Sequence, residues 1–211
     1  RSEPIKLSFG FKQNVKKARK AGFLIKKTAS TEMVPQLLKL MDTTRESRVK
    51  KYGQFYDPMF LVNLNETTLK ALLESGIGVL YYAEREGEIP SIQINIEKNG
   101  QIYGLLMGSD QSAYKTGVPS FIDHTITQMA VENQAVYYNL GPVPKEEEGG
   151  EGIRRYKEAQ GARPVKRYGY YSFYLTFPLY LLNPLMKLSK KLPDNGFFNF
   201  FRNISRLFGV N

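Results

Sequence analysis

The sequence predicts an α+β domain: a mixed sheet with a central antiparallel meander, flanking helices and a helical C-terminal extension. Three observations predict it. Apolar and polar residues alternate over residues 89–96, the pair Asn99-Gly100 favours a tight hairpin turn, and amphipathic helical patterns precede and follow these runs. The length of 211 residues suits one large domain. We expect this domain to span residues 1–177 and the extension to span residues 178–211.

The first predicted element is an amphipathic helix over residues 11–22. Phe11, Val15 and Ala18 fall at helical spacing, and Gly22 ends the pattern. The helix carries a basic patch on its exposed side, formed by Lys12, Lys16, Lys17, Arg19 and Lys20. A short strand over residues 23–25 follows.

Two further helices are expected before the meander. One begins near Ser30 or Thr31, and Pro35 is tolerated in its first turn. Its buried stripe is predicted to consist of Val34, Leu37, Leu38 and Met41. The other is capped by Asn65 and turns Leu69, Leu72 and Leu73 inward.

The meander joins three β-rich runs at residues 79–82, 89–96 and 101–107, the last two through the Asn99-Gly100 turn. In the second run isoleucine alternates with polar residues. We therefore expect one buried face, with Ile92, Ile94 and Ile96, and one solvated face, with Gln93, Asn95 and Glu97.

Helices and strands alternate after the meander. Pro119-Ser120 opens a helix that runs to about Asn133, and its buried positions are Ile122, Ile126, Met129 and Ala130. A strand over residues 136–140 stops at Gly141-Pro142. A helix over residues 153–160 ends at Gly161, and an aromatic strand is expected over residues 165–177.

Composition excludes several classes of chemistry. Cysteine is absent and His124 is the only histidine, so thiolate and multi-histidine metal sites are excluded and we expect no metal. The net charge of +10 predicts a polyanionic partner. The chain begins at Arg1, as expected of a trimmed chain, and shows neither a signal peptide nor a run of ~20 apolar residues. We therefore expect a cytoplasmic location.

Four segments resemble the GCN5-related N-acetyltransferase (GNAT) superfamily, and within it the Fem-type branch of FemA, FemB and FemX. The helix at residues 11–22 is similar to the family's R-x-N-x-x-K-A-x-K-x-G pattern, and residues 82–106 match its hairpins. Residues 137–141 resemble a Y-D-L-G strand end, and residues 152–162 a G-[LIV]-x-x-F-K-x-x-F-G segment. The likeness runs from about Phe9 to Lys166 in the family's order.

The resemblance implies transfer of an acyl or aminoacyl group to a primary amine, as in bacterial peptidoglycan-bridge synthesis. It implies that Lys157 stabilises negative charge, with Tyr156 beside it where the family has Phe. It also implies that Tyr138, Asn139 and Gly141 hold substrate at a strand end, although Asn139 replaces the family's acid.

The resemblance leaves the acyl donor open between aminoacyl-tRNA and acyl-CoA, and no tightly bound cofactor is expected. The acetyl-CoA loop, Q/R-x-x-G-x-G/A, belongs between the third meander strand and the next helix. Residues 108–119 do not match it. A CoA-dependent N-acetyltransferase is one alternative. A non-catalytic lobe that binds a partner or nucleic acid is the other.

Three segments have both a functional and a purely structural interpretation. Lys115, Thr116 and Gly117 precede a helix and offer backbone N–H groups to an anion. The basic patch either follows a nucleic-acid backbone, including that of a tRNA, or is simply solvated. The apolar and basic pattern of residues 195–208 predicts either contact with the inner membrane surface, near a cell-wall precursor as acceptor, or packing within the protein. His124 is expected to be a packed or surface residue.

Overall fold

A computed structural model describes residues 5–52, 64–143 and 150–165. The aromatic strand expected at 165–177, the extension at 178–211, its boundary and the membrane contact at 195–208 lie outside these residues. The elements before the meander are α1 (Phe9–Lys20), β1 (Leu24–Thr28), a 3₁₀ turn (Thr31–Met33), α2 (Val34–Tyr52) and α3 (Glu66–Glu74). They are followed by β2 (Gly78–Arg85), β3 (Glu88–Lys98), β4 (Gln101–Ser109), α4 (Gln111–Thr116), α5 (Val118–Glu132), β5 (Tyr137–Asn139) and α6 (Gly150–Ala159).

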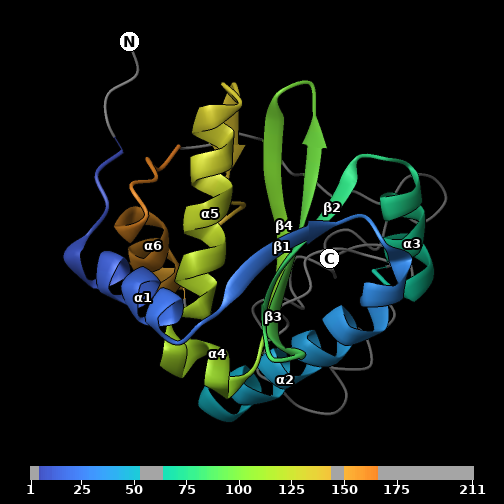
Figure 1. Ribbon diagram of the computed structural model, residues 1–211, viewed down its shortest axis with the longest axis horizontal. Coiled ribbons are helices and arrows are strands. Elements are labelled where there is room, and N and C mark those ends of the chain that lie inside the picture. The colour runs from blue at the N-terminus through green and yellow to red at the C-terminus, as the bar shows by residue number, and fades with distance from the viewer. Residues whose placement is uncertain (1–4, 53–63, 144–149, 166–211) are drawn as a thin grey trace, which may run out of the picture. The chain divides into compact units, whose positions relative to one another are not determined.

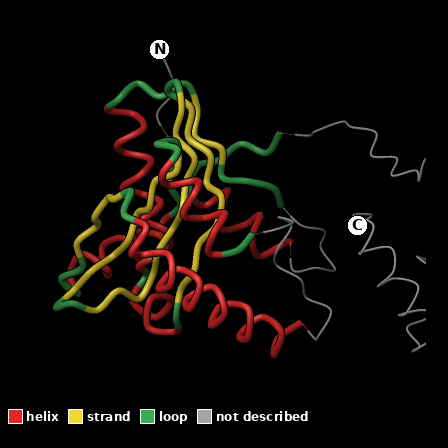
Figure 2. The backbone as a smooth tube through the Cα atoms, turned by 90° about the vertical axis from the view of Figure 1, so that its right-hand side faces the viewer, coloured by secondary structure: helices red, strands yellow, loops and turns green. Residues whose placement is uncertain are grey.

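The five strands form one mixed sheet in the order β1-β2-β3-β4-β5. The first four are antiparallel neighbours, and β5 pairs in parallel with β4 (Figures 1 and 2). Asn99 and Gly100 both have positive φ, as the predicted hairpin turn requires. The predicted fold class and the meander are therefore confirmed.

Helices cover both faces of the sheet. α2 and α3 pack on the face that carries Leu80, Ile92 and Ile94. α1, α5 and α6 lie together on the opposite face (Figure 1), whose core includes Tyr81 and Ala83. None of the helices in these ranges has the length and apolarity that crossing a bilayer requires.

The expectation of a solvated sheet face is wrong. Gln93 and Asn95 are buried with 5% and 0% exposure, because α5 covers the face on which they lie. The alternation of isoleucine with polar residues correctly assigned side chains to the two faces of β3. It did not show that helices cover both of these faces. The buried side of α2 also differs from the prediction at one position, because Leu40 is buried where Leu38 was expected. The predicted Asn65 cap is present.

A bulge changes the direction of side chains along β4. Ile94 pairs with Leu106 while Asn95 pairs with Gly104, so Leu105 is an extra residue. Because strand side chains alternate, this extra residue exchanges the two faces. Ile102 and Met107 consequently contact the same core, beneath α5, although five positions separate them.

The turn between α4 and α5 lies directly against α1. Gly117 has φ +77°, and a Cβ added there would lie 2.5 Å from the Asn14 carbonyl oxygen. Glycine is required both by the left-handed backbone and by this close approach.

We predict that Gly117→Ala lowers the free energy of unfolding by about 3 kcal/mol, because it adds a clash to the 1–2 kcal/mol cost of left-handed alanine. Urea unfolding measures the change. Gly76→Ala is the matched control, since Gly76 has φ +75° and open space around it. An equal loss in both variants would mean that the approach of α1 contributes nothing.

Candidate active site

The candidate site lies where β4 extends past β5. Strand pairing joins Gln101–Tyr103 to Tyr137–Asn139 and then stops, while β4 continues to Ser109. On this side, residues 104–109 of β4 have no partner strand among the described residues. An unpaired strand edge offers N–H and C=O groups to an extended ligand.

The chain turns sharply where β5 ends. The Gly141 N–H donates to the Asn139 side-chain oxygen (2.8 Å), and Gly141 has φ +79°. A Cβ on Gly141 would lie 3.3 Å from the Gly104 carbonyl oxygen, so the turn lies against the β4 bulge. The predicted residues Tyr138, Asn139 and Gly141 thus come together beside the open edge of β4.

Lys157 of α6 reaches this turn. Its ammonium donates to the carbonyl oxygens of Gly141 (3.0 Å) and Pro142 (2.7 Å). Burial lowers the pKa of Lys157, and the charge of Asp123 partly opposes that shift. A cation at this position, at the end of β5 and beside the open edge of β4, can stabilise a developing oxyanion.

A buried carboxylate, absent from the sequence-based site, lies behind these residues. Asp123 of α5 has 4% exposure and accepts hydrogen bonds from Tyr156 (2.8 Å), Tyr138 (3.1 Å) and Gln160 (3.1 Å). Burial raises the pKa of Asp123, while these hydrogen bonds act in the opposite direction. Asp123 therefore joins α5 to β5 and α6.

Asp123 had a detectable sequence signal. It directly follows Phe121 and Ile122 and stands three residues before Ile126, all of which are buried. An acid within a buried stripe requires buried partners.

The polar network continues into the sheet. Gln93 donates from its amide nitrogen to the Tyr138 hydroxyl (2.8 Å) and to the Asn95 side-chain oxygen (2.9 Å). Ser91 and Ser109 share a hydroxyl–hydroxyl hydrogen bond of 2.8 Å on the same face. Gln93 and Asn95, two of the three residues expected to face water, instead form a buried polar layer beneath α5 together with Ser91 and Ser109, while Glu97 is partly exposed.

Tyr156 and Lys157 point in different directions, as consecutive helical residues do. The Tyr156 hydroxyl is directed inward to Asp123, and its ring lies 6.2 Å from the Phe11 ring of α1. Burial and the Asp123 charge raise the pKa of Tyr156 well above its usual value. Tyr156 holds α6 in place, and Lys157 alone of this pair reaches the strand end.

The sequence predicts an anion-binding loop at Lys115, Thr116 and Gly117. The structure has the end of helix α4 there instead. Lys115 and Thr116 form the last turn of α4, and the Gly117 N–H already donates to the Tyr114 carbonyl. Val118 and Ser120, at the start of α5, are 0% and 3% exposed. Asp110 caps α4 and so favours a helix where a loop was expected.

These contacts also test whether a CoA pyrophosphate fits the turn before α5. A phosphate cradle needs free N–H groups at an accessible helix N-terminus. Here α1 lies 2.5 Å from the position of a Gly117 Cβ, Pro119 has no N–H, and the flanking residues are buried. The residues present do not fit the pyrophosphate at this position.

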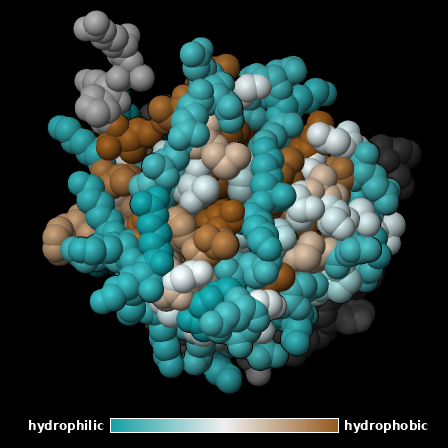
Figure 3. All heavy atoms as spheres, viewed as in Figure 1, coloured by the Kyte–Doolittle hydropathy of each residue, from teal (hydrophilic) through white to brown (hydrophobic). Residues whose placement is uncertain are grey.

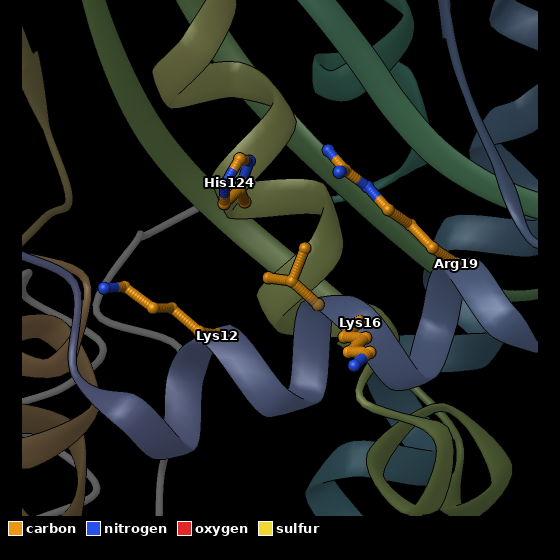
Figure 4. Close-up of a pocket in the computed structure, with 5 residues that line it drawn as sticks. Lys12, Lys16, Arg19 and His124 are labelled. Atoms are coloured by element: carbon orange, nitrogen blue, oxygen red, sulfur yellow. The ribbon is translucent and has the colours of Figure 1, made fainter.

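The basic patch divides into two parts. Lys12, Lys16 and Arg19 line a hollow of about 240 Å³ together with Val15 and His124 (Figure 4). Lys17 and Lys20 are exposed but do not line it. Burial and the charge of Arg19 lower the pKa of His124. Among the described residues no cluster of acids and histidine suits a metal ion.

Comparisons with known proteins identify the family and the fold. The acetyltransferase (GNAT) domain family matches residues 10–158. No curated protein matches the sequence. A tetramutant of the BH1408 protein from Bacillus halodurans superposes with a TM-score of 0.53 at 14% identity, over 71% of this chain and 99% of that one.

Two other solved structures are similar to the chain. FemX has a TM-score of 0.56 at 12% identity, covering 74% of this chain and 54% of that one. A possible acetyltransferase from Clostridium difficile 630 has a TM-score of 0.51 at 12% identity, covering 72% and 99%. At these identities the likeness is one of fold.

We predict that Asp123→Asn lowers the free energy of unfolding by about 2–3 kcal/mol, because an amide group leaves buried hydroxyl and amide donors poorly paired. Urea unfolding measures this. Asp42→Asn, at an exposed position on α2, is the control and should change stability by less than about 0.5 kcal/mol.

The stability contributed by Asp123 should depend on pH in a defined direction. Its pKa is raised above 3.8, so between that value and the raised pKa the folded protein binds more protons than the unfolded chain. The contribution of Asp123 therefore falls as the pH rises through its folded pKa. We expect wild type and Asp123→Asn to differ more at about pH 5 than at about pH 8. A difference that grows with pH would contradict the raised pKa.

Proposed function

The chain belongs to the acetyltransferase (GNAT) domain family, whose members are N-acyltransferases, and from this premise we propose that it is a Fem-type enzyme. In this proposal it moves an aminoacyl group from an RNA ester to a primary amine. The acceptor is an amine of a bacterial cell-wall precursor, as the Fem-type resemblance implies. An acyl-CoA-dependent N-acetyltransferase is the alternative.

One observation carries the proposal: the Lys157 ammonium at the end of β5, beside the open edge of β4. The acceptor amine attacks the ester carbonyl carbon, so that an N–C bond forms and the carbonyl oxygen becomes negative. The C–O ester bond then breaks, and the released ribose oxygen takes the proton that the amine loses. Lys157 stabilises the oxyanion in the intermediate.

Asp123 has a positioning role in this mechanism. Three donors occupy its carboxylate, and it is 4% exposed, so it is poorly placed to take a proton from a substrate. Through the Tyr156 hydroxyl it fixes α6, and thereby the residue next to Tyr156, which is Lys157. Tyr138, which also donates to Asp123, holds β5 in register with this helix.

The choice of donor rests on the turn before α5. A CoA donor needs an anchor for its pyrophosphate, and the N-terminus of α5 is buried beneath α1. An aminoacyl ester on RNA needs no such cradle. The Fem-type pattern of residues 152–162, with its aromatic-lysine pair, supports the same donor.

We predict that Lys157→Ala lowers kcat about 100-fold, the usual cost of losing one charge-stabilising group, and changes the melting temperature little. The assay uses tRNA charged with a radiolabelled amino acid, and an amine-bearing cell-wall precursor as acceptor. Arg155→Ala is the control, because Arg155 is exposed on α6 and pairs with Glu151. Unchanged turnover in Lys157→Ala would remove Lys157 from the mechanism.

Titration calorimetry separates the two donors. We expect acetyl-CoA to produce no saturable heat at micromolar concentrations, because the turn before α5 offers no phosphate cradle. Saturable micromolar binding would favour the N-acetyltransferase. If neither donor supports transfer, the non-catalytic lobe becomes the better description.

A further inference from the structure

Helix α1 has two faces that serve different purposes. Phe11, Val15 and Ala18 are 3%, 5% and 0% exposed and pack into the core with α5. Its other face carries an exposed set of residues at helical spacing, here named the α1 stripe: Phe9, Lys12, Lys16, Arg19 and Lys20. Hydrophilic side chains gather over this helix in the space-filling view (Figure 3).

Three cations of the stripe have no acidic partner within the described part of the chain. Lys26 and Lys27 of β1 form ion pairs with Glu84 and Glu97. Lys12, Lys16 and Arg19, by contrast, form no salt bridge within the described part of the chain. A helix dipole favours cations in the last turn, which accounts for Arg19 and Lys20 but not for Lys12 in the first turn.

One cation of the stripe is held in position. Arg19 donates to the Gln128 side chain (3.4 Å), and its guanidinium lies 5.3 Å from the centre of the Phe121 ring, both on α5. Together with Lys12, Lys16 and His124 it surrounds the hollow of about 240 Å³ (Figure 4). Three uncompensated cations around a concave surface attract an anion of phosphate size.

Phe9, the aromatic residue of the α1 stripe, favours a nucleic acid over a lipid surface as the polyanion. Phe9 is 78% exposed and precedes Lys12 by three positions, so both lie on one side of α1. Lipid binding by a helix requires a free apolar face, and the apolar face of α1 is buried in the core. An exposed ring beside a row of cations is the arrangement that stacks a base and neutralises phosphates in single-stranded nucleic acids.

We propose that the α1 stripe binds a single-stranded segment of RNA, with phosphates at Lys12, Lys16 and Arg19 and a base against Phe9. This deepens the proposed function and rests on it, since the RNA is the carrier of the transferred group. Lys12 to Arg19 spans about 10 Å of helix axis, so the α1 stripe contacts only a few nucleotides.

The stripe belongs to the same packed unit as the candidate site. The Ser8 N–H, at the start of α1, donates to the Ala159 carbonyl at the end of α6 (2.9 Å), and Phe11 packs against Tyr156. His124 of the hollow directly follows Asp123 on α5. RNA held on α1 is therefore attached to the helices that position Lys157.

The test measures binding of the full chain to a fluorescent 12-nucleotide single-stranded RNA by anisotropy over a range of salt concentrations. We expect log K against log salt to have a slope of about −2, from three phosphates at 0.7 each. Lys12→Gln/Lys16→Gln/Arg19→Gln should weaken binding about tenfold or more. Lys39→Gln/Arg45→Gln/Lys98→Gln removes the same charge elsewhere, at exposed positions, and should weaken binding less than about twofold. Equal losses in the two triple variants would overturn the proposal.

A second set of variants tests the contact between Phe9 and a base. Phe9→Ala should weaken RNA binding about tenfold, within the range measured for base stacking, and Phe9→Trp should retain it. Tyr114→Ala removes another exposed aromatic, 52% exposed on α4, and should have no effect. Binding to vesicles of phosphatidylglycerol and phosphatidylcholine that depends on the α1 stripe, without RNA binding, would overturn the assignment in favour of a membrane.

The two proposals fail in different ways. If the triple variant of the stripe transfers the aminoacyl group with unchanged KM for charged tRNA, the α1 stripe is not the RNA site, and the proposed function stands. If the stripe binds RNA as expected but no aminoacyl transfer occurs, the proposed function fails and the RNA site stands.

Discussion

The arrangement of the site depends on one buried acceptor, the carboxylate of Asp123. It accepts hydrogen bonds from a strand residue, Tyr138, and from two residues of the following helix, Tyr156 and Gln160. A desolvated carboxylate is costly unless such donors surround it. The cost makes the geometry specific, because any displacement of β5 or α6 leaves buried charge or buried hydroxyl groups without partners. The position of Lys157 follows from this constraint.

The polar layer of the sheet extends the same constraint. Gln93 connects the Tyr138 hydroxyl to Asn95, and Ser91 and Ser109 are bonded to each other on the same face. The bulge at Leu105 is needed for this layer, because it turns Ser109 and Met107 towards α5 while Ile102 already faces that side. An ideal strand of the same sequence would direct one half of β4 to the wrong layer.

Helix α1 contacts the turn before α5 on one side and presents cations on the other. Its backbone closes the turn before α5, where Asn14 meets Gly117, and so removes the helix N-terminus that would accept a pyrophosphate. The same helix presents Lys12, Lys16 and Arg19 on its outer side. Both features follow from the amphipathic pattern of α1, which packs one side against α5 and carries its cations on the other.

Sequence periodicity determined the helices, the meander and the hairpin turn, because these features depend on residues a few positions apart. Motif order identified the GNAT family, which the match to residues 10–158 confirms, and it brought Lys157, Tyr138, Asn139 and Gly141 into one site that the structure assembles. The Fem-type role remains a prediction. Only the tertiary structure decided that Gln93 and Asn95 are buried, that α1 lies against Gly117, and that Asp123 is the hub of the site. These three outcomes depend on which element lies over a residue, and local sequence pattern does not encode contacts between residues 15 to 103 positions apart.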